Sequence, residues 1–329
     1  MCELLPDSVD LVKAHGHEIG CHNYSYSHAQ DKALDVLSYM KNNLDFTFVK
    51  YKELCETIVE SKYATLTFTH YFSLKNIPEK FIILRHDVDR RPENALEMAK
   101  IENNSGITST YYFRRKEEVF KPEIIKEIAN MGHEIGYHYE VLDKAKGDLE
   151  KGIKIFEKEL NEFRKICDVK TICMHGNPLS KWVNKDIWKK YDFRDFGIIG
   201  EPYLSIDYTR VLYLTDTGRK WNSRFSVKDV VGANVNQAIE KVKSTDDVIR
   251  LINEGDTEQM CILAHPERWS DSFGAWLKEL VWQNVKNIGK AILVRRAYYG
   301  KEGGQVCLCD DAGDFLYADR RGDSDAVWR

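Results

Sequence analysis

Apolar and polar positions follow a regular alternation from about residue 80 to residue 300. Short apolar runs rich in β-branched and aromatic residues predict strands, and stretches with an apolar residue at every third or fourth position predict helices. The clearest helical stretch is 149–163, whose apolar stripe consists of Leu149, Ile153, Phe156, Leu160 and Phe163. We interpret this stripe as part of the core, because one apolar face on a polar cylinder is typical of a helix packed on a sheet.

The alternation predicts a parallel sheet. Seven strands are expected, at 81–85, 107–113, 133–138, 170–175, 196–200, 210–215 and 260–265. Helices are expected at 92–104, 122–131, 149–163, 235–253 and 272–287, with a lead-in helix at 51–61 and an edge strand at 64–71. Right-handed crossovers between parallel strands allow such a sheet to close into a barrel.

The chain divides into three parts by pattern. We expect a barrel at 47–299, an extension at 1–46, and a Gly- and Asp-rich tail at 300–329 that is weakly ordered. The motif Gly-His-Glu-Ile-Gly-x-His occurs at 16–22 and again at 132–138. We interpret the first copy as the end of a truncated second unit.

Composition restricts the classes of partner and compartment. The chain is 43% hydrophobic and 30% charged, with a formal net charge of −4, which gives no reason to expect binding to nucleic acid. Eight cysteines are scattered without a CxxC pair, so the spacing of structural zinc sites is missing and a reducing compartment is indicated. Neither a signal-peptide pattern nor a membrane-span run is visible, and we therefore expect a cytoplasmic protein without a transmembrane segment.

Polar and titratable residues recur where the predicted strands end. In parallel barrels the chemistry collects at the carboxyl ends of the strands. The residues at these positions are Asp87, Asp89, Arg114, His138, Glu140, His175, Glu201, Asp216 and His265.

The acidic pair after the first strand is the most informative of these features. Asp87 and Asp89 are two residues apart and would project from the same face of a strand. Two like charges this close are costly unless a cation or a shared proton relieves them. A metal ion would do so and would leave one carboxylate as a base. The alternative is a cluster of helix-capping residues before Pro92.

Four motifs in a fixed order connect the chain to a known family. They are Arg-His-Asp-Val-Asp at 85–89, Gly-His-Glu-Ile-Gly-Tyr-His at 132–138, Leu-Thr-Asp at 214–216 with Trp221, and Leu-Ala-His-Pro-Glu-Arg-Trp at 263–269. With these motifs, residues 47–295 resemble the polysaccharide deacetylase superfamily, also called the NodB-homology or carbohydrate esterase 4 group. The resemblance implies a distorted seven-stranded (β/α) barrel that uses a divalent metal, here expected to be Zn²⁺, to remove acyl groups from amino sugars.

The resemblance also implies a ligand set. Asp87 would be the base, while Asp89 and His138 would bind the metal. The position of the family's second metal-binding histidine is Leu142, which cannot bind a metal. We therefore expect Glu140 as the third ligand, with His175 and Asp143 as open alternatives.

Further roles follow from the same resemblance. His265 would donate a proton to the departing amine, and Asp216 would favour its protonated form. The family's third motif normally carries an arginine, which is missing here, so Arg114 would orient the base unless it forms a surface ion pair instead. The residues expected to bind substrate are Arg114, His175, Asn177, Trp221 and Trp269, although the two tryptophans fit a buried aromatic pair nearly as well. We interpret His133 as structural.

The function expected from the sequence is removal of an acyl group, N-acetyl above all, from an amino sugar in a nucleotide- or lipid-linked precursor of a surface polysaccharide. Two alternatives remain open. Leu142 and the missing arginine fit a catalytically decayed barrel that acts as a carbohydrate-binding or scaffold module. A hydrolase of non-sugar amides would share the same architecture.

Overall fold

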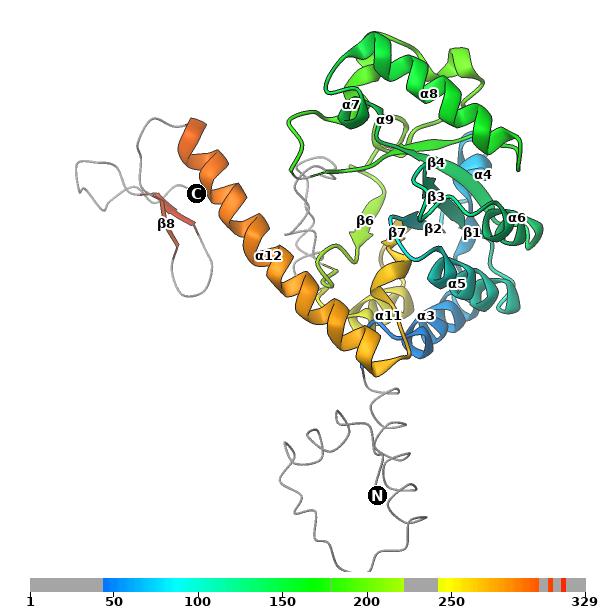
Figure 1. The fold of residues 1–329 in the computed structure, drawn as a ribbon. Helices are drawn as coiled ribbons and strands as arrows, with labels where there is room; N and C mark the ends of the chain where they lie inside the picture. The colour runs from blue at the N-terminus through cyan, green and yellow to red at the C-terminus, as the bar shows by residue number, and fades with distance from the viewer. Residues whose placement is uncertain (1–43, 178, 222–241, 302–306, 310–314, 318–329) are drawn as a thin grey trace, which may run out of the picture.

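The computed structural model describes residues 44–177, 179–221, 242–301, 307–309 and 315–317. In this part of the chain, seven parallel strands form one curled sheet with helices around it, a half-barrel (Figure 1). The predicted mixed α/β class and parallel sheet are confirmed. The strands are β1 (Ala64–Leu66), β2 (Phe81–Val88), β3 (Thr110–Arg114), β4 (Glu134–Tyr139), β5 (Ile172–Met174), β6 (Leu212–Thr215) and β7 (Gln259–Ala264).

Strand β2 lies at the centre of the sheet. The hydrogen-bonded order is β5-β4-β3-β2-β7-β6, and β1 pairs with the first residues of β2 on the side where β3 pairs with its last residues. All eight residues of β2 are buried. The strand runs three residues beyond its predicted end, so Asp87 lies within it and not in the loop that follows.

The two faces of β2 have different surroundings because side chains alternate along a strand. Phe81 and Ile83 belong to a buried cluster that also contains Tyr112, Cys173 and Leu263. Ile82 and Leu84 belong instead to a cluster formed with helices α3 (Phe48–Glu60), α5 (Pro92–Asn104) and α11 (Thr245–Glu254). Arg85 and Asp87 have the parity of Ile83, and the site therefore extends the first of these clusters.

Helices cover the outside of the sheet (Figure 1). Those between β3 and β6 are α6 (Pro122–Asn130), α7 (Val141–Lys144), α8 (Leu149–Arg164) and α9 (Pro202–Ser205). The side chain of Asp148 caps α8, and Phe156, Leu160 and Phe163 are buried in the core beside it. The predicted role of the 149–163 stripe is confirmed. In the predicted helix 235–253, residues 235–241 lie outside the described part, and the remainder is helical from the start of α11 at Thr245.

Two strand predictions are wrong, the one at 196–200 entirely and the one at 64–71 in part. At 196–200 there is no strand: a 3₁₀ turn at Phe193–Phe196 ends at Gly197, whose φ of 70° turns the chain, and Gly200 makes a single bridge with Thr171. At 64–71 the strand ends at Leu66, because the Thr67 side chain caps α4 (Phe68–Ser73) by accepting a hydrogen bond from the backbone of His70. Strands β5 and β6 are consequently the ends of the hydrogen-bonded order.

The outer parts of the chain are described only in pieces. The first copy of the Gly-His-Glu-Ile-Gly motif lies outside the described residues. Helix α12 (Phe273–Lys301) passes the predicted boundary at 299, and within the tail β8 (Cys307–Cys309) pairs antiparallel with β9 (Phe315–Tyr317).

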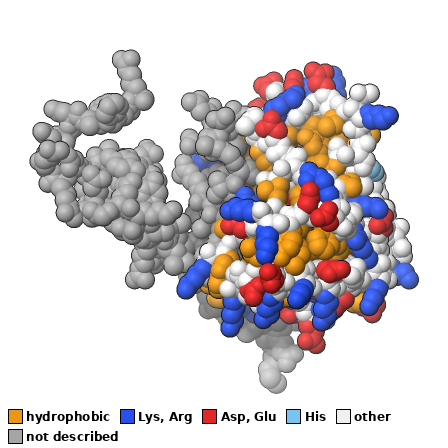
Figure 2. Space-filling view, turned by 90° about the horizontal axis from the view of Figure 1, so that it is seen from above, with side chains coloured by type: hydrophobic (Ala, Val, Ile, Leu, Met, Phe, Trp, Pro, Cys, Tyr) orange, Lys and Arg blue, Asp and Glu red, His pale blue; other side chains and the backbone are white. Residues whose placement is uncertain are grey.

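The surface is mixed in charge where it can be seen. On the face drawn in Figure 2, lysine and arginine are interspersed with aspartate and glutamate around hydrophobic areas. Among the described helices, none combines the length and apolar character that crossing a bilayer requires.

Close packing at Gly136 of β4 gives a test of the fold. A Cβ there would lie 2.2 Å from a ring carbon of Tyr112. We expect Gly136→Ala to lower the free energy of unfolding by about 1–3 kcal/mol, since overpacking forces a core side chain off its preferred position. Urea denaturation measures the change. Gly274→Ala in α12 is the control, because nothing lies within 4 Å of its added Cβ; equal stability of the two variants would contradict the packing.

Candidate functional site

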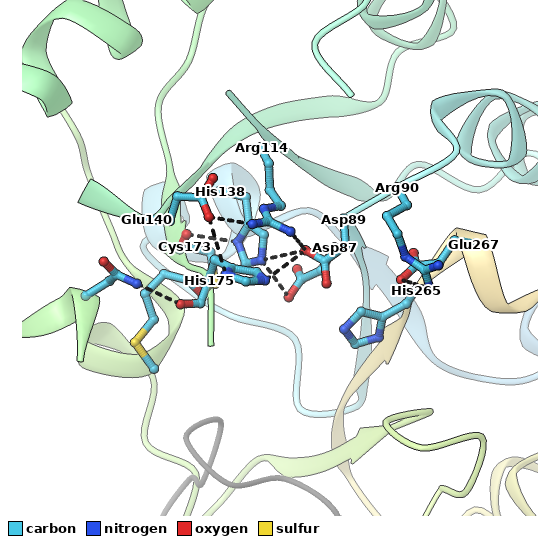
Figure 3. A network of polar contacts seen from close by, with 12 residues as sticks. Asp87, Asp89, Arg90, Arg114, His138, Glu140, Cys173, His175, His265 and Glu267 are labelled. Carbon is cyan, nitrogen blue, oxygen red and sulfur yellow. Dashed lines mark hydrogen bonds and ion pairs between the residues drawn. The ribbon is translucent and has the colours of Figure 1, made fainter. Parts of the chain in front are cut away.

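Charged side chains lie together at the carboxyl ends of the strands, along one edge of the sheet (Figure 3). Strand β2 supplies Asp87, with Asp89 just beyond it, and the ends of β3, β4 and β5 supply the side chains that face this pair. The structure brings together Asp87, Asp89, Arg114, His138, Glu140 and His175. Asp216 and His265, at the ends of β6 and β7, form a second pair beside them.

Arg85 holds Asp87 from the same strand. Its Nε and Nη2 donate to Asp87 Oδ1 and Oδ2 at 2.8 and 2.7 Å, because residues two apart project from one face. Burial alone would raise the pKa of Asp87, but the charge and hydrogen bonds of Arg85, together with His138 and His265, outweigh it and the net pKa is lowered. The prediction that Arg114 orients this carboxylate is wrong. Arg85 does so, and its i, i+2 spacing was a signal available in the sequence.

Asp89 has a carboxylate oxygen without a hydrogen bond. Its Oδ1 is buried, 3.4 Å from His175 Nε2, 3.6 Å from His138 Nε2 and 3.8 Å from Arg114 Nη1. Burial opposes ionisation, yet His175 and Arg114 together hold the pKa of Asp89 well below its usual range. The oxygen is therefore charged and surrounded by nitrogen atoms that it does not hydrogen-bond.

His138 presents a lone pair to both aspartates. Its Nδ1 lies 3.0 Å from the Cys173 carbonyl oxygen, an acceptor, so Nδ1 carries the proton and Nε2 does not. Burial lowers the pKa of His138 to about 4, which keeps the ring neutral near pH 7. Nε2 faces Asp87 Oδ2 and Asp89 Oδ1, each at 3.6 Å. Three lone-pair atoms thus converge with no proton between them, an arrangement that a cation would stabilise.

His175 approaches Asp89 from the end of β5. Its ring stands nearly perpendicular to that of His138, with centroids 5.3 Å apart. The backbone nitrogen of His175 donates to the Tyr139 carbonyl at 2.8 Å, and the Asn184 side chain donates to the His175 carbonyl at 3.0 Å. The backbone of His175 is thus fixed on both sides.

Glu140, the predicted third ligand, is engaged elsewhere. Arg114 forms an ion pair with its carboxylate, and Lys144 Nζ lies 3.6 Å away. Against burial, the Arg114 charge lowers the pKa of Glu140. A carboxylate already neutralised by two cations is a poor ligand, so the structure does not favour this assignment.

Two groups of described residues have ligand atoms within 4.8 Å of one another: Asp87, His138 and Cys173, and Glu140, Asp143 and His175. In the first group Arg85 donates hydrogen bonds to both Asp87 and the Cys173 sulfur, so the lone pair of His138 is the one that remains available to bind a cation. In the second group Asp143 accepts hydrogen bonds from Ser180 and Asn184, and Glu140 is engaged by Arg114, so His175 is the ligand that remains available. Asp89 lies next to the imidazoles of both His138 and His175.

The second pair consists of a buried carboxylate and the imidazole beside it. Asp216 accepts from His265 Nδ1 at 2.7 Å and from the His265 backbone at 2.9 Å, and Arg268 and Trp269 donate to it as well. These donors outweigh burial and lower the pKa of Asp216 to about 2. Burial and the Arg268 charge lower the pKa of His265, but the charge and hydrogen bond of Asp216, together with the charge of Glu267, outweigh them and the net pKa is raised.

Three predicted substrate contacts have other surroundings. Trp221 and Trp269 are 0% exposed and pack with Phe46 in the core, so the expectation that they form walls for a sugar is wrong. Asn177 lies in the loop after β5, where its side chain accepts a hydrogen bond from the backbone of Leu179.

His133 is buried and hydrogen-bonded to Ser109 and the Ala99 carbonyl, which confirms its predicted structural role.

The Asp216–His265 pair gives a direct titration test. Asp216→Asn removes the main charge that raises the pKa of His265 and leaves burial and Arg268, both of which lower it by more than the remaining Glu267 raises it. We expect the His265 pKa to fall below its ordinary value of about 6.5. Imidazole resonances followed by NMR over a pH series would measure the shift, with His133 as internal reference; an unchanged His265 would contradict the assignment.

Comparisons with known proteins return nothing similar. No protein-family model matches the chain, and no curated protein or solved structure matches it. The activity is therefore inferred from the side chains at the carboxyl edge of the sheet.

Proposed function

We propose that this protein is a metal-dependent hydrolase that removes an acyl group, N-acetyl above all, from an amino sugar. The observation that carries the proposal is the approach of two imidazole nitrogens to Asp89 Oδ1, a buried oxygen without a hydrogen bond: His138 Nε2, without a proton, at 3.6 Å and His175 Nε2 at 3.4 Å. The deacetylase-like order of motifs in the sequence supports the same activity.

Asp89, His138 and His175 supply the donor types of a divalent-metal site, and the two imidazoles come from the two groups of convergent ligand atoms. One carboxylate oxygen and two imidazole nitrogens are typical ligands of a catalytic zinc. Ligand atoms bonded to zinc at about 2.0–2.1 Å stand roughly 3.3 Å apart in a tetrahedral site, and Asp89 Oδ1 lies 3.4 and 3.6 Å from the two imidazole nitrogens. We assign Asp89, His138 and His175 as the residues that would hold the ion. When bound, the ion would polarise the acyl carbonyl and activate water.

Asp87 is suited to act as the base. Arg85 fixes both of its oxygens and keeps it ionised. The carboxylate faces the same point as His138 Nε2 without being one of the three assigned ligands. It would accept the proton of the attacking water, a role worth roughly 10²–10⁴ in rate.

His265 is suited to act as the acid. Asp216 orients its ring through Nδ1 and raises its pKa, so the opposite nitrogen, Nε2, is the one that would donate a proton to the leaving amine. His265 also lies close enough to Asp87 for its charge to lower the pKa of that carboxyl. Acid and base would thus both lie near the scissile bond.

Metal content separates this proposal from a catalytically decayed barrel. We expect the protein purified without chelator to contain one zinc per chain, and Asp89→Asn, His138→Ala and His175→Ala each to lose it. Elemental analysis by mass spectrometry is the measurement. Glu140→Gln should keep the zinc, and His70→Ala, an exposed histidine on α4, controls for loss of an imidazole. A metal-free wild type that binds sugars would favour a carbohydrate-binding module.

Activity tests the roles of Asp87 and His265. With a panel of N-acetylated amino sugars and cyclic amides, we expect Asp87→Asn to lower kcat by roughly 10²–10⁴, and Asp207→Asn, an exposed aspartate at the opposite end of the sheet, to leave it unchanged. Because His265 acts protonated, kcat should fall as the pH rises through its raised pKa. In Asp216→Asn this alkaline limb should move to lower pH. Cleavage of cyclic amides alone would exclude the sugar substrate.

A further inference from the structure

Helix α12 packs with its polar side towards the body. Glu279, Gln283 and Asn287, spaced four residues apart on one face, are only 2, 3 and 7% exposed. Glu279 accepts from Arg90 at 3.0 Å and from Gln283 at 2.6 Å. Asn287 donates to the Gly218 carbonyl at 3.0 Å. Hydrogen bonds and an ion pair therefore hold this face of the helix against the body.

The opposite side of α12 is apolar and open. Leu277, Val281, Trp282 and Val285 are 42, 55, 51 and 55% exposed, and their spacing places them along one stripe. This is the reverse of a helix that belongs only to a water-soluble body, whose apolar stripe faces the core. A contiguous stripe of this kind marks an interaction surface, whereas single exposed apolar residues do not.

The excess of basic residues in α12 favours an anionic binding partner for the apolar stripe. The helix has a single acidic residue, Glu279, which is buried against Arg90. Its basic residues are Lys278, Lys286, Lys290, Arg295, Arg296 and Lys301. The whole chain, in contrast, has a formal net charge of −4. Lys278 is exposed next to Leu277, at the start of the stripe. A second copy of the same helix would bring like charges together, and an anionic partner would not.

We infer that the outward face of α12 binds the surface of an anionic lipid bilayer. Apolar side chains beside a basic, acid-poor flank are the composition of helices that lie in the plane of the interface. Trp282 is of the residue type enriched at the boundary between headgroups and acyl chains. At a rise of about 1.5 Å per residue the helix is roughly 43 Å long, enough to lie along the surface. The inference is independent of the proposed hydrolase activity.

Vesicle co-sedimentation of the full chain tests the inference. We expect binding to vesicles of phosphatidylcholine with phosphatidylglycerol, weakening as salt is added, and little binding to phosphatidylcholine alone. The double variant Val281→Asp, Val285→Asp should bind at least about tenfold more weakly. Val59→Asp is the matched control, because Val59 is a valine of similar exposure, 53%, on helix α3.

A second variant keeps the test decisive if the double variant does not fold. Lys278→Glu should weaken binding to the anionic vesicles about fivefold. The inference is overturned if the wild type does not bind these vesicles, or if both α12 variants bind as the wild type does. A dimer in sedimentation analysis that dissociates in Val281→Asp, without vesicle binding, would assign the stripe to a second copy and would likewise overturn it.

Discussion

The alternation of side chains along β2 is the constraint on which the site depends. Arg85 and Asp87 face the site, whereas His86 between them faces the helices on the other side of the strand. There Glu102 of α5 accepts hydrogen bonds from Tyr51, His86, Ser109 and Tyr111, all buried. A shift of one residue in the register of β2 would exchange the two faces and break both networks. The Glu102 network therefore fixes the direction in which Asp87 points, although it never reaches the site.

Three carboxylates in the described part of the carboxyl edge are each bound by an arginine. Asp87 is bound by Arg85, Glu140 by Arg114, and Asp216 by Arg268. Asp89 has no arginine of its own, since its nearest guanidinium nitrogen, at 3.8 Å, belongs to Arg114, which is engaged by Glu140. A buried carboxylate oxygen without a hydrogen bond is costly. The pattern of pairing thus leaves Asp89 as a negative centre for a cation, at the point where two imidazoles approach it.

The sequence predicted what depends on local pattern. Apolar runs located six of the seven expected strands, and strand ends located the residues of the site, because both are properties of short segments. It failed where a contact between distant segments decides the outcome. Arg114 was expected to orient Asp87, but it forms an ion pair with Glu140 instead. Trp221 and Trp269 were expected to contact a sugar, but they are core residues because Phe46 and Tyr51 pack against them. The strand at 196–200 failed for a local reason, the left-handed Gly197, that an apolar count does not register.

Arg90 connects the candidate metal site to helix α12. This residue follows Asp89 directly, and its guanidinium joins Glu279 of α12 at 3.0 Å and Glu267 at 3.7 Å. The helix with the outward apolar stripe is therefore tied to the loop that carries the unpaired carboxylate. A bilayer bound to α12 would stand at a fixed orientation to the site, because the polar face of the helix has its partners within the body. Of the two kinds of precursor that the sequence leaves open, such an arrangement would suit the lipid-linked one, whose sugar would remain at the membrane during the proposed removal of its acyl group.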